Sequence, residues 1–353
     1  MSEFLNEKLK KVIPYVPGEQ PQDKKYIKLN TNESPFPVSI KAKSLLRKEI
    51  KKVQLYPDPD VKSLTETVAK DLGVKSENVL MTNGSDEILN FAFMAYCDKK
   101  IPAVFADITY GFYKVFAQIN DTAYREIPLD LNFEINIEDY FNANGTIFIA
   151  NPNAPTGINL SLDKIKKILD NNKNNIVVID EAYVDFGGES AVSLINEYDN
   201  LLVTRTFSKS RSMAGARLGF GVASKKIISD LITVKYSTNP YNVNRLTACM
   251  GIASVKDDKY FKKCVNKIVL AREKTVCTLK EKGFFVTESK TNFIFCKHNK
   301  ISGEKLYEEL KNRGILVRHF SSERIKDFVR ITVGTESQMQ KLVSEIDDIL
   351  GEI

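Results

Sequence analysis

Short apolar runs rich in β-branched residues alternate with segments of helical spacing between about residues 79 and 222. The runs are almost uninterrupted in apolar character, which is typical of strands covered on both faces in a largely parallel sheet. A segment of helical spacing, 162–169, lies between two of the runs. This alternation predicts an α/β layered fold with a mainly parallel sheet. We expect its strands at 102–106, 146–150, 176–180, 201–205 and 218–222.

The pattern changes after about residue 245, where a long helical stretch precedes short strands and a closing helix. This order is typical of a smaller α+β domain. The first 45 residues carry five prolines and no long periodic segment. We therefore expect an N-terminal arm and linker (1–45) packed with the small domain, a large domain (46–244) and a small C-terminal domain (245–353). The C-terminal elements are expected at about 260–282, 284–287, 292–296, 303–313, 315–318, 329–333 and 336–350.

Composition excludes several classes of protein. Hydrophobic residues make up 43% of the 353 residues, enough for a sizeable core, and the net charge of +6 forms no concentrated basic stripe. We therefore expect no nucleic-acid partner, and no apolar stretch is long enough to predict a membrane span. The five cysteines include no CxxC pair, which argues against a disulfide framework or a metal site. Because the N-terminus lacks an apolar signal core, a cytoplasmic location is the default expectation.

Lys209 carries most of the functional argument, because it follows an apolar strand run in Thr206-Phe207-Ser208-Lys209. Asp180 ends another such run, at the edge where open α/β sheets bind their ligands. Alone, these would be an ordinary loop lysine and a turn or cap aspartate. Together with Tyr183 and Asn153 they supply what pyridoxal phosphate requires: an amine for a Schiff base, a carboxylate for the ring nitrogen and donors for the ring oxygen. Asn153 also fits a turn, since Asn-Pro and Pro-Thr-Gly form turns.

A phosphate group needs donors and positive charge, and two segments offer them. Ser85 and Asp86 stand in Asn83-Gly84-Ser85-Asp86-Glu87, which follows a short strand and opens a helix. A helix N-terminus favours an anion, although Ser85 alone would also be an ordinary N-cap. Further donors are expected from Thr206, Ser208 and Arg217. Tyr110, at a predicted strand end, could stack on the cofactor ring or simply pack in the core.

Arginine also occurs where an apolar strand is expected. Arg330 interrupts Phe328-Val329-Arg330-Ile331-Thr332-Val333, and Arg318 follows Ile315-Leu316-Val317. A charged residue in such a pattern is costly unless it is paired. Each arginine is therefore part of a structural ion pair or lies at the edge of the sheet, or, as the sharper hypothesis, its planar guanidinium binds an anion.

The motifs in their order resemble the pyridoxal-phosphate-dependent transferases of fold type I, and within them the class II aminotransferase family with the aspartate aminotransferase fold. Each motif is weak alone, but their joint order is specific and spans nearly the whole chain. The segments that carry the resemblance are 14–18, 29–35, 56–57, 83–87, 151–157, 180–183, 205–209, 214–219 and 329–334. The resemblance implies a large domain with a mainly parallel sheet and a smaller α+β domain.

The resemblance also implies roles for individual residues. Lys209 would form the Schiff base with the cofactor, and Tyr56 would reach across a homodimer interface to the neighbouring subunit's cofactor phosphate. The substrate pocket would be lined by Tyr15, Asn32, Arg318 and Arg330.

The implied reaction moves the amino group of L-histidinol phosphate to 2-oxoglutarate, which yields imidazole-acetol phosphate and glutamate in histidine biosynthesis. An aromatic-amino-acid aminotransferase and a threonine-phosphate decarboxylase are the alternatives. Two places depart from the family pattern: Asp107 stands where proline is common, and 321–324 replaces a glycine-containing loop. Both departures bear on substrate preference more than on cofactor binding.

Overall fold

A seven-stranded sheet forms the larger part of the molecule in the computed structural model, which describes residues 2–353. Its strand order is β2-β8-β7-β6-β5-β3-β4, and β8 alone runs antiparallel to its two neighbours. The strands are β2 (Val79–Thr82), β3 (Ala103–Ala106), β4 (Tyr124–Ile127), β5 (Thr146–Ala150), β6 (Val177–Asp180), β7 (Leu201–Thr206) and β8 (Gly219–Ala223).

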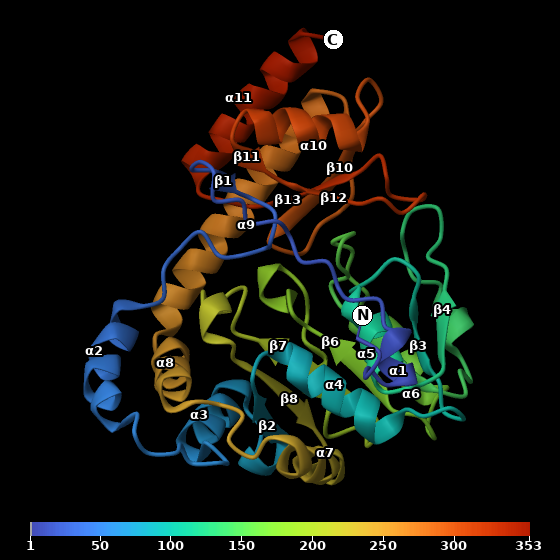
Figure 1. Cartoon of the computed structure of the whole chain (residues 1–353), viewed down its shortest axis with the longest axis vertical. Helices are drawn as coiled ribbons and strands as arrows, with labels where there is room; N and C mark the ends of the chain where they lie inside the picture. Colours follow the sequence, from blue (N-terminus) through green and yellow to red (C-terminus); the bar gives the residue numbers. More distant parts are fainter. Residues whose placement is uncertain (1) are drawn as a thin grey trace.

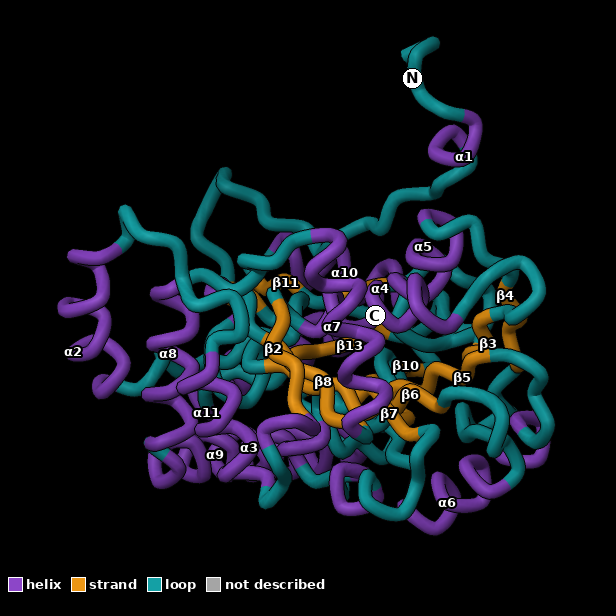
Figure 2. Tube along the Cα trace, turned by 90° about the horizontal axis from the view of Figure 1, so that it is seen from below, coloured by secondary structure: helices purple, strands orange, loops and turns teal. Residues whose placement is uncertain are grey.

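Helices cover both faces of this sheet (Figure 2). One face packs against α3 (Lys62–Leu72) and α6 (Leu162–Asp170). The other packs against α4 (Ser85–Tyr96), α5 (Phe112–Ile119) and α7 (Lys225–Thr238). The central strands are therefore buried on both sides, which explains their uninterrupted apolar sequences.

A second, antiparallel sheet of order β12-β13-β10-β9 lies at the other end of the molecule (Figure 1). Its strands are β9 (Phe284–Val286), β10 (Phe293–His298), β12 (Arg318–His319) and β13 (Val329–Thr332). Three helices accompany it: α9 (Asp258–Glu281), α10 (Gly303–Asn312) and α11 (Glu336–Gly351). Their apolar faces and the sheet form a separate core.

The N-terminal segment contacts both the small and the large part of the molecule. Its strand β1 (Ile27–Lys28) pairs in parallel with β11 (Ile315–Leu316), beside the small sheet, whereas α1 (Glu7–Lys10) lies against α5. Helix α2 (Ile40–Glu49) begins inside the stretch that we expected to be irregular, and it packs on α8 (Arg245–Lys256). The remaining elements are the short 3₁₀ helices η1 (Ile50–Lys52), η2 (Ser76–Asn78), η3 (Ile137–Tyr140), η4 (Val184–Phe186), η5 (Ala191–Leu194) and η6 (Ala214–Ala216).

The predicted fold class is confirmed, and the ends of the five expected strands agree within one residue with β3, β5, β6, β7 and β8. Strand β4 was missed because it is an edge strand whose sequence, Tyr-Arg-Glu-Ile, lacks an apolar run. The domain boundaries stay predictions. Helix α8, which follows the expected boundary at 244, contributes Val255 to the core of the large sheet.

Candidate active site

Lys209 lies at a cavity of about 150 Å³ beyond the carboxyl ends of β6 and β7. Nine of the eleven residues predicted to bind the cofactor line this cavity. They are Ser85, Asp86, Tyr110, Asp180, Tyr183, Thr206, Ser208, Lys209 and Arg217. They come from five separate segments, which the parallel strands bring to one edge of the sheet, as expected for a ligand site of this architecture.

Asp180 lines the cavity and is almost wholly buried. Burial raises the pKa of Asp180 to about 6, although two hydroxyl donors favour its charged form. The Tyr113 hydroxyl donates to one carboxylate oxygen at 3.1 Å and the Thr204 hydroxyl to the other at 3.2 Å. The carboxylate is thus held in place, but no cationic side chain within residues 2–353 is paired with it. Such a group suits a ligand that brings its own positive charge.

Tyr183 is held by a chain of hydrogen bonds that the sequence did not reveal. The Asn32 side-chain amide donates to the Tyr183 hydroxyl oxygen at 2.8 Å, and the Thr332 hydroxyl donates to the Asn32 carbonyl at 3.0 Å. Asn32 adopts a left-handed backbone with φ of +56°, which asparagine tolerates well. Since the Tyr183 oxygen already accepts from Asn32, its own proton is free to be donated into the cavity.

The N-terminus of α4 forms another part of the cavity wall. A Cβ atom on Gly219 would lie 2.4 Å from the carbonyl carbon of Gly84 and from the nitrogen of Ser85, so only glycine lets β8 approach the helix this closely. Arg217 donates to Asp86 at 2.8 Å, and the Tyr110 hydroxyl donates to the same carboxylate at 2.7 Å. Hydroxyls, a guanidinium and helix amides therefore surround one end of the cavity, as an anion requires.

Two of the predicted cofactor residues do not line the cavity. The Asn153 side-chain amide donates to the Ile108 carbonyl at 2.9 Å and to the Thr156 hydroxyl at 3.0 Å, and the next residue, Ala154, lines the cavity. That Asn153 binds the ring oxygen stays a prediction; in this structure its side-chain amide hydrogens are already donated to protein acceptors. Tyr56 is 77% exposed and stacks on Tyr241 with ring centroids 4.6 Å apart, so it does not reach the cavity of its own chain.

A larger cavity of about 680 Å³ adjoins the first. It is lined by all four residues predicted to bind substrate, which are Tyr15, Asn32, Arg318 and Arg330. The two cavities share the side chains of Tyr110, Ala154, Tyr183 and Lys209. The lysine amine, 5.8 Å from the centre of the Tyr183 ring, thus stands at the boundary between the two spaces.

The larger cavity carries positive charge. Arg318 and Arg330 are directly opposite one another on β12 and β13, so their side chains share a face of the small sheet. Arg318 donates to the carbonyls of Val16 and Pro17 in the N-terminal arm at 3.1 Å each. Arg330 forms only a long bond of 3.3 Å to the Asn30 carbonyl, and burial lowers its pKa. Because no carboxylate within residues 2–353 pairs with Arg330, its guanidinium is prepared for an incoming anion.

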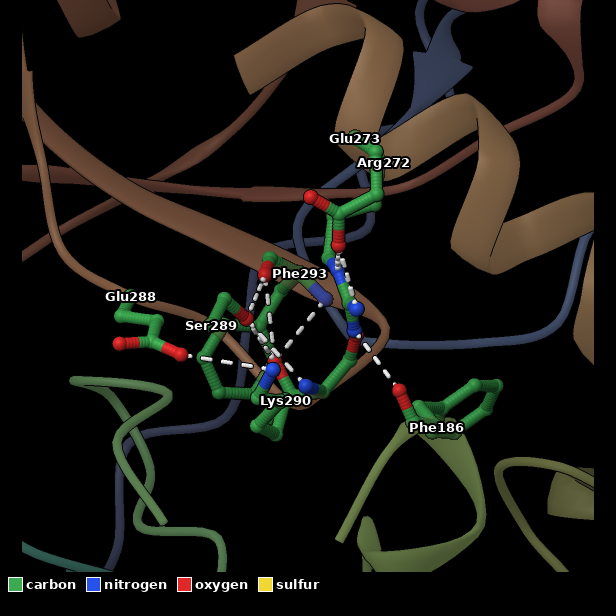
Figure 3. A network of polar contacts seen from close by, with 8 residues as sticks. Phe186, Arg272, Glu273, Glu288, Ser289, Lys290 and Phe293 are labelled. Carbon is green, nitrogen blue, oxygen red and sulfur yellow. Dashed lines mark hydrogen bonds and ion pairs between the residues drawn. The ribbon is translucent and has the colours of Figure 1, made fainter. Parts of the chain in front are cut away.

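A further network ties the small sheet to the site (Figure 3). Buried Arg272 on α9 donates to the carbonyl of Phe186, three residues after Tyr183, and to that of Thr291. The neighbouring Lys290 amide donates to the Gly157 carbonyl at 2.9 Å. An arginine on the apolar face of a helix is the one weak sign of this role in the sequence. The network joins the β9–β10 connection to the two loops that contain Gly157 and Phe186, which flank the cavity.

Comparison with known proteins agrees with this geometry. The chain belongs to the class I and II aminotransferase family, whose pattern it matches over residues 24–346. It is 49% identical to histidinol-phosphate aminotransferase of Brachyspira hyodysenteriae, over 99% of each chain. The same enzyme of Clostridium acetobutylicum is 47% identical, over 99% of this chain and 100% of that one. In fold, it is similar to the Sinorhizobium meliloti enzyme in complex with pyridoxal-5'-phosphate, with a TM-score of 0.91, 20% identity and coverage of 100% and 99%.

Proposed function

We propose that the protein transfers the amino group of L-histidinol phosphate to 2-oxoglutarate, with pyridoxal phosphate as its cofactor. The observation that carries this proposal is the position of Lys209 between a cavity with an anion-binding end and a larger cavity with two arginines. The full-length identity to histidinol-phosphate aminotransferases supports the choice of substrate.

The smaller cavity fits the cofactor in charge and in arrangement. Arg217, Ser208 and the N-terminus of α4 would hold the phosphate, and the buried carboxylate of Asp180 would pair with the ring nitrogen. The free proton of Tyr183 would be donated to the ring oxygen. When bound, pyridoxal phosphate draws electrons from the carbon that carries the substrate's amino group.

Lys209 would act on the substrate from the boundary of the two cavities. Its Nζ can first hold the cofactor and then, once free, take and return the proton of the amino-bearing carbon. The two histidines are occupied elsewhere: His298 lies by the Lys282 carbonyl, and His319 by the Lys326 carbonyl. A single amine can therefore supply both the nucleophile and the base.

The two arginines would select substrates that carry an anionic end. L-Histidinol phosphate presents a phosphate where glutamate presents a carboxylate, and a planar guanidinium pairs with either group through two parallel bonds. Arg330 has its donors nearly free, whereas Arg318 also holds the N-terminal arm. Arg330 is therefore the better candidate for the contact that both substrates share.

We also propose a homodimer in which Tyr56 completes the neighbouring subunit's phosphate site. Its 77% exposure, in an exposed apolar segment with Val53 and Leu55, supports this assignment. Light scattering should give twice the chain mass, and Tyr56→Phe should weaken cofactor binding. A monomer that binds the cofactor fully would contradict the proposal. The cytoplasmic location stays a prediction; no helix within residues 2–353 is both long and apolar enough to span a bilayer.

Steady-state assays with L-histidinol phosphate, phenylalanine and threonine phosphate test the function. We expect amino transfer to 2-oxoglutarate with L-histidinol phosphate as the preferred donor, and no release of CO2 from threonine phosphate. Lys209→Ala should abolish both turnover and the visible absorption band of the bound cofactor. Preference for phenylalanine, or normal rates in the Lys209 variant, would refute the proposal.

A further inference from the structure

Residues 320–325, the first part of the connection between β12 and β13 (320–328), form part of the wall of the larger cavity. Phe320, Ser322 and Ile325 all line it. In Figure 1 this connection extends from the small sheet toward the loops above β4 at the edge of the large sheet. One wall of the cavity is therefore built by a segment that must be kept in place across the gap between the two sheets.

Arg324 attaches this connection to the large sheet. Its guanidinium donates to the Asp107 carboxylate at 2.7 Å and to the carbonyls of Leu129 and Asp130 at 2.8 Å each. The other carboxylate oxygen of Asp107 accepts from the Leu129 amide at 2.9 Å. The guanidinium also lies 5.9 Å from the centre of the Phe133 ring. The two places where the sequence departs from the family pattern are thus in direct contact.

The attachment covers an apolar cluster shared by the two sheets. Ala106, Ile108, Leu129 and Phe133 come from the large part, and Phe295, Ile325 and Phe328 from the small part. Apolar packing of these side chains stabilises the contact, but it does not by itself fix the position of the connection relative to the large sheet. The hydrogen bonds of the planar Arg324 guanidinium are directional and therefore fix this position.

The connection also touches the anion site. The Phe320 ring centre lies 5.9 Å from the Arg318 guanidinium and 5.8 Å from that of Arg330, and the ring packs on Phe295. A shift of residues 320–325 would therefore move the ring that stands beside both arginines.

We propose that Arg324 is a positioning residue: by bonding to Asp107 and to the 129–130 backbone, it fixes the 320–325 wall and so the affinity for the anionic end of the substrate. The effect on substrate affinity rests on the proposed function, whereas the claim that Arg324 fixes the 320–325 wall does not. Arg324 touches neither the cofactor cavity nor Lys209, so the proton-transfer step should be spared.

The test compares the holoenzyme with Arg324→Ala, Arg324→Lys and Asp107→Asn. For Arg324→Ala we expect KM for L-histidinol phosphate to rise roughly three- to tenfold with kcat within about twofold, as befits a partly exposed ion pair with extra hydrogen bonds. Arg324→Lys should recover part of the loss. The double variant Asp107→Asn/Arg324→Ala should be no worse than Arg324→Ala, because both changes remove the same interaction.

Lys274→Ala is the matched control, since it removes an exposed 2.8 Å ion pair to Glu336 that lies outside the substrate cavity. It should leave KM unchanged. Hydrogen–deuterium exchange supplies a second readout: amides of 320–327 should exchange faster in Arg324→Ala than in wild type. Unchanged KM and unchanged exchange would overturn the inference. If wild type does not use L-histidinol phosphate, the proposed function fails, while the exchange experiment still decides the role of Arg324.

Discussion

Arg330→Met should separate function from stability, because it removes a guanidinium that has almost no partners in the substrate-free protein. Methionine keeps an unbranched apolar stem of similar length. Arg330 makes one long hydrogen bond of 3.3 Å, and its buried Nε has no hydrogen-bond partner. By contrast, Arg205, Arg211 and Arg324 each form an ion pair with an aspartate.

The magnitude follows from two opposing effects. An unsatisfied buried polar group costs about 1–3 kcal/mol, which the substitution relieves. The guanidinium also lies 5.2 Å from the Phe293 ring centre and 5.8 Å from that of Phe320, and each such contact is worth about 0.5–1 kcal/mol, which the substitution loses. The relief of about 1–3 kcal/mol and the loss of about 1–2 kcal/mol largely offset each other, so we expect the free energy of unfolding to change by no more than about 2 kcal/mol.

Catalysis should respond much more strongly. Hydrogen bonds to charged groups are worth about 1.5–3 kcal/mol, so losing a two-pronged contact should cost about 3 kcal/mol in kcat/KM, or about a hundredfold. The loss should appear with both L-histidinol phosphate and glutamate, because both present their anionic end to the same fork.

The assay pairs steady-state kinetics with urea unfolding of the cofactor-loaded enzyme. Arg318→Met is the stability control: it removes two bonds to the N-terminal arm and should lower the unfolding midpoint. Our reasoning is refuted if Arg330→Met unfolds more easily than Arg318→Met, or if it loses activity toward one substrate alone.

Two further predictions concern the cofactor cavity. Because burial raises the pKa of Asp180 from 3.8 to about 6, its contribution to the stability of the cofactor-free protein is lost as pH rises from about 4 to about 6. At about 1.4 kcal/mol per pH unit over that window, the loss is about 3 kcal/mol. The free energy of unfolding should therefore fall with this slope in wild type but not in Asp180→Asn. Parallel pH curves for the two proteins would contradict the prediction. Gly219→Ala forces a methyl group to 2.4 Å from the backbone at the start of α4, so it should cost about 1–3 kcal/mol and weaken cofactor binding in a spectroscopic titration. The control Gly215→Ala meets nothing within 4 Å and should bind normally; equal behaviour of the two variants would count against the close approach.

Much of the site was predictable because its residues follow strands. Asp180 and Lys209 stand near the ends of apolar runs that only a buried strand explains, and parallel strands present such ends at one edge. The role of Asn153 stays a prediction, because a turn asparagine and a ligand donor look alike in sequence. Their difference lies in which partner takes the amide hydrogens, here Ile108 and Thr156.

The sequence by itself determined the layered α/β fold, the family and the chemistry of the cofactor cavity, because apolar periodicity and motif order are local properties of the chain. Only the tertiary structure decided that Asn32 supports Tyr183 and that Arg324 meets Asp107. These pairs lie 151 and 217 residues apart, and hydrogen-bond geometry over such separations depends on how the two sheets are placed in space. No local pattern encodes that placement.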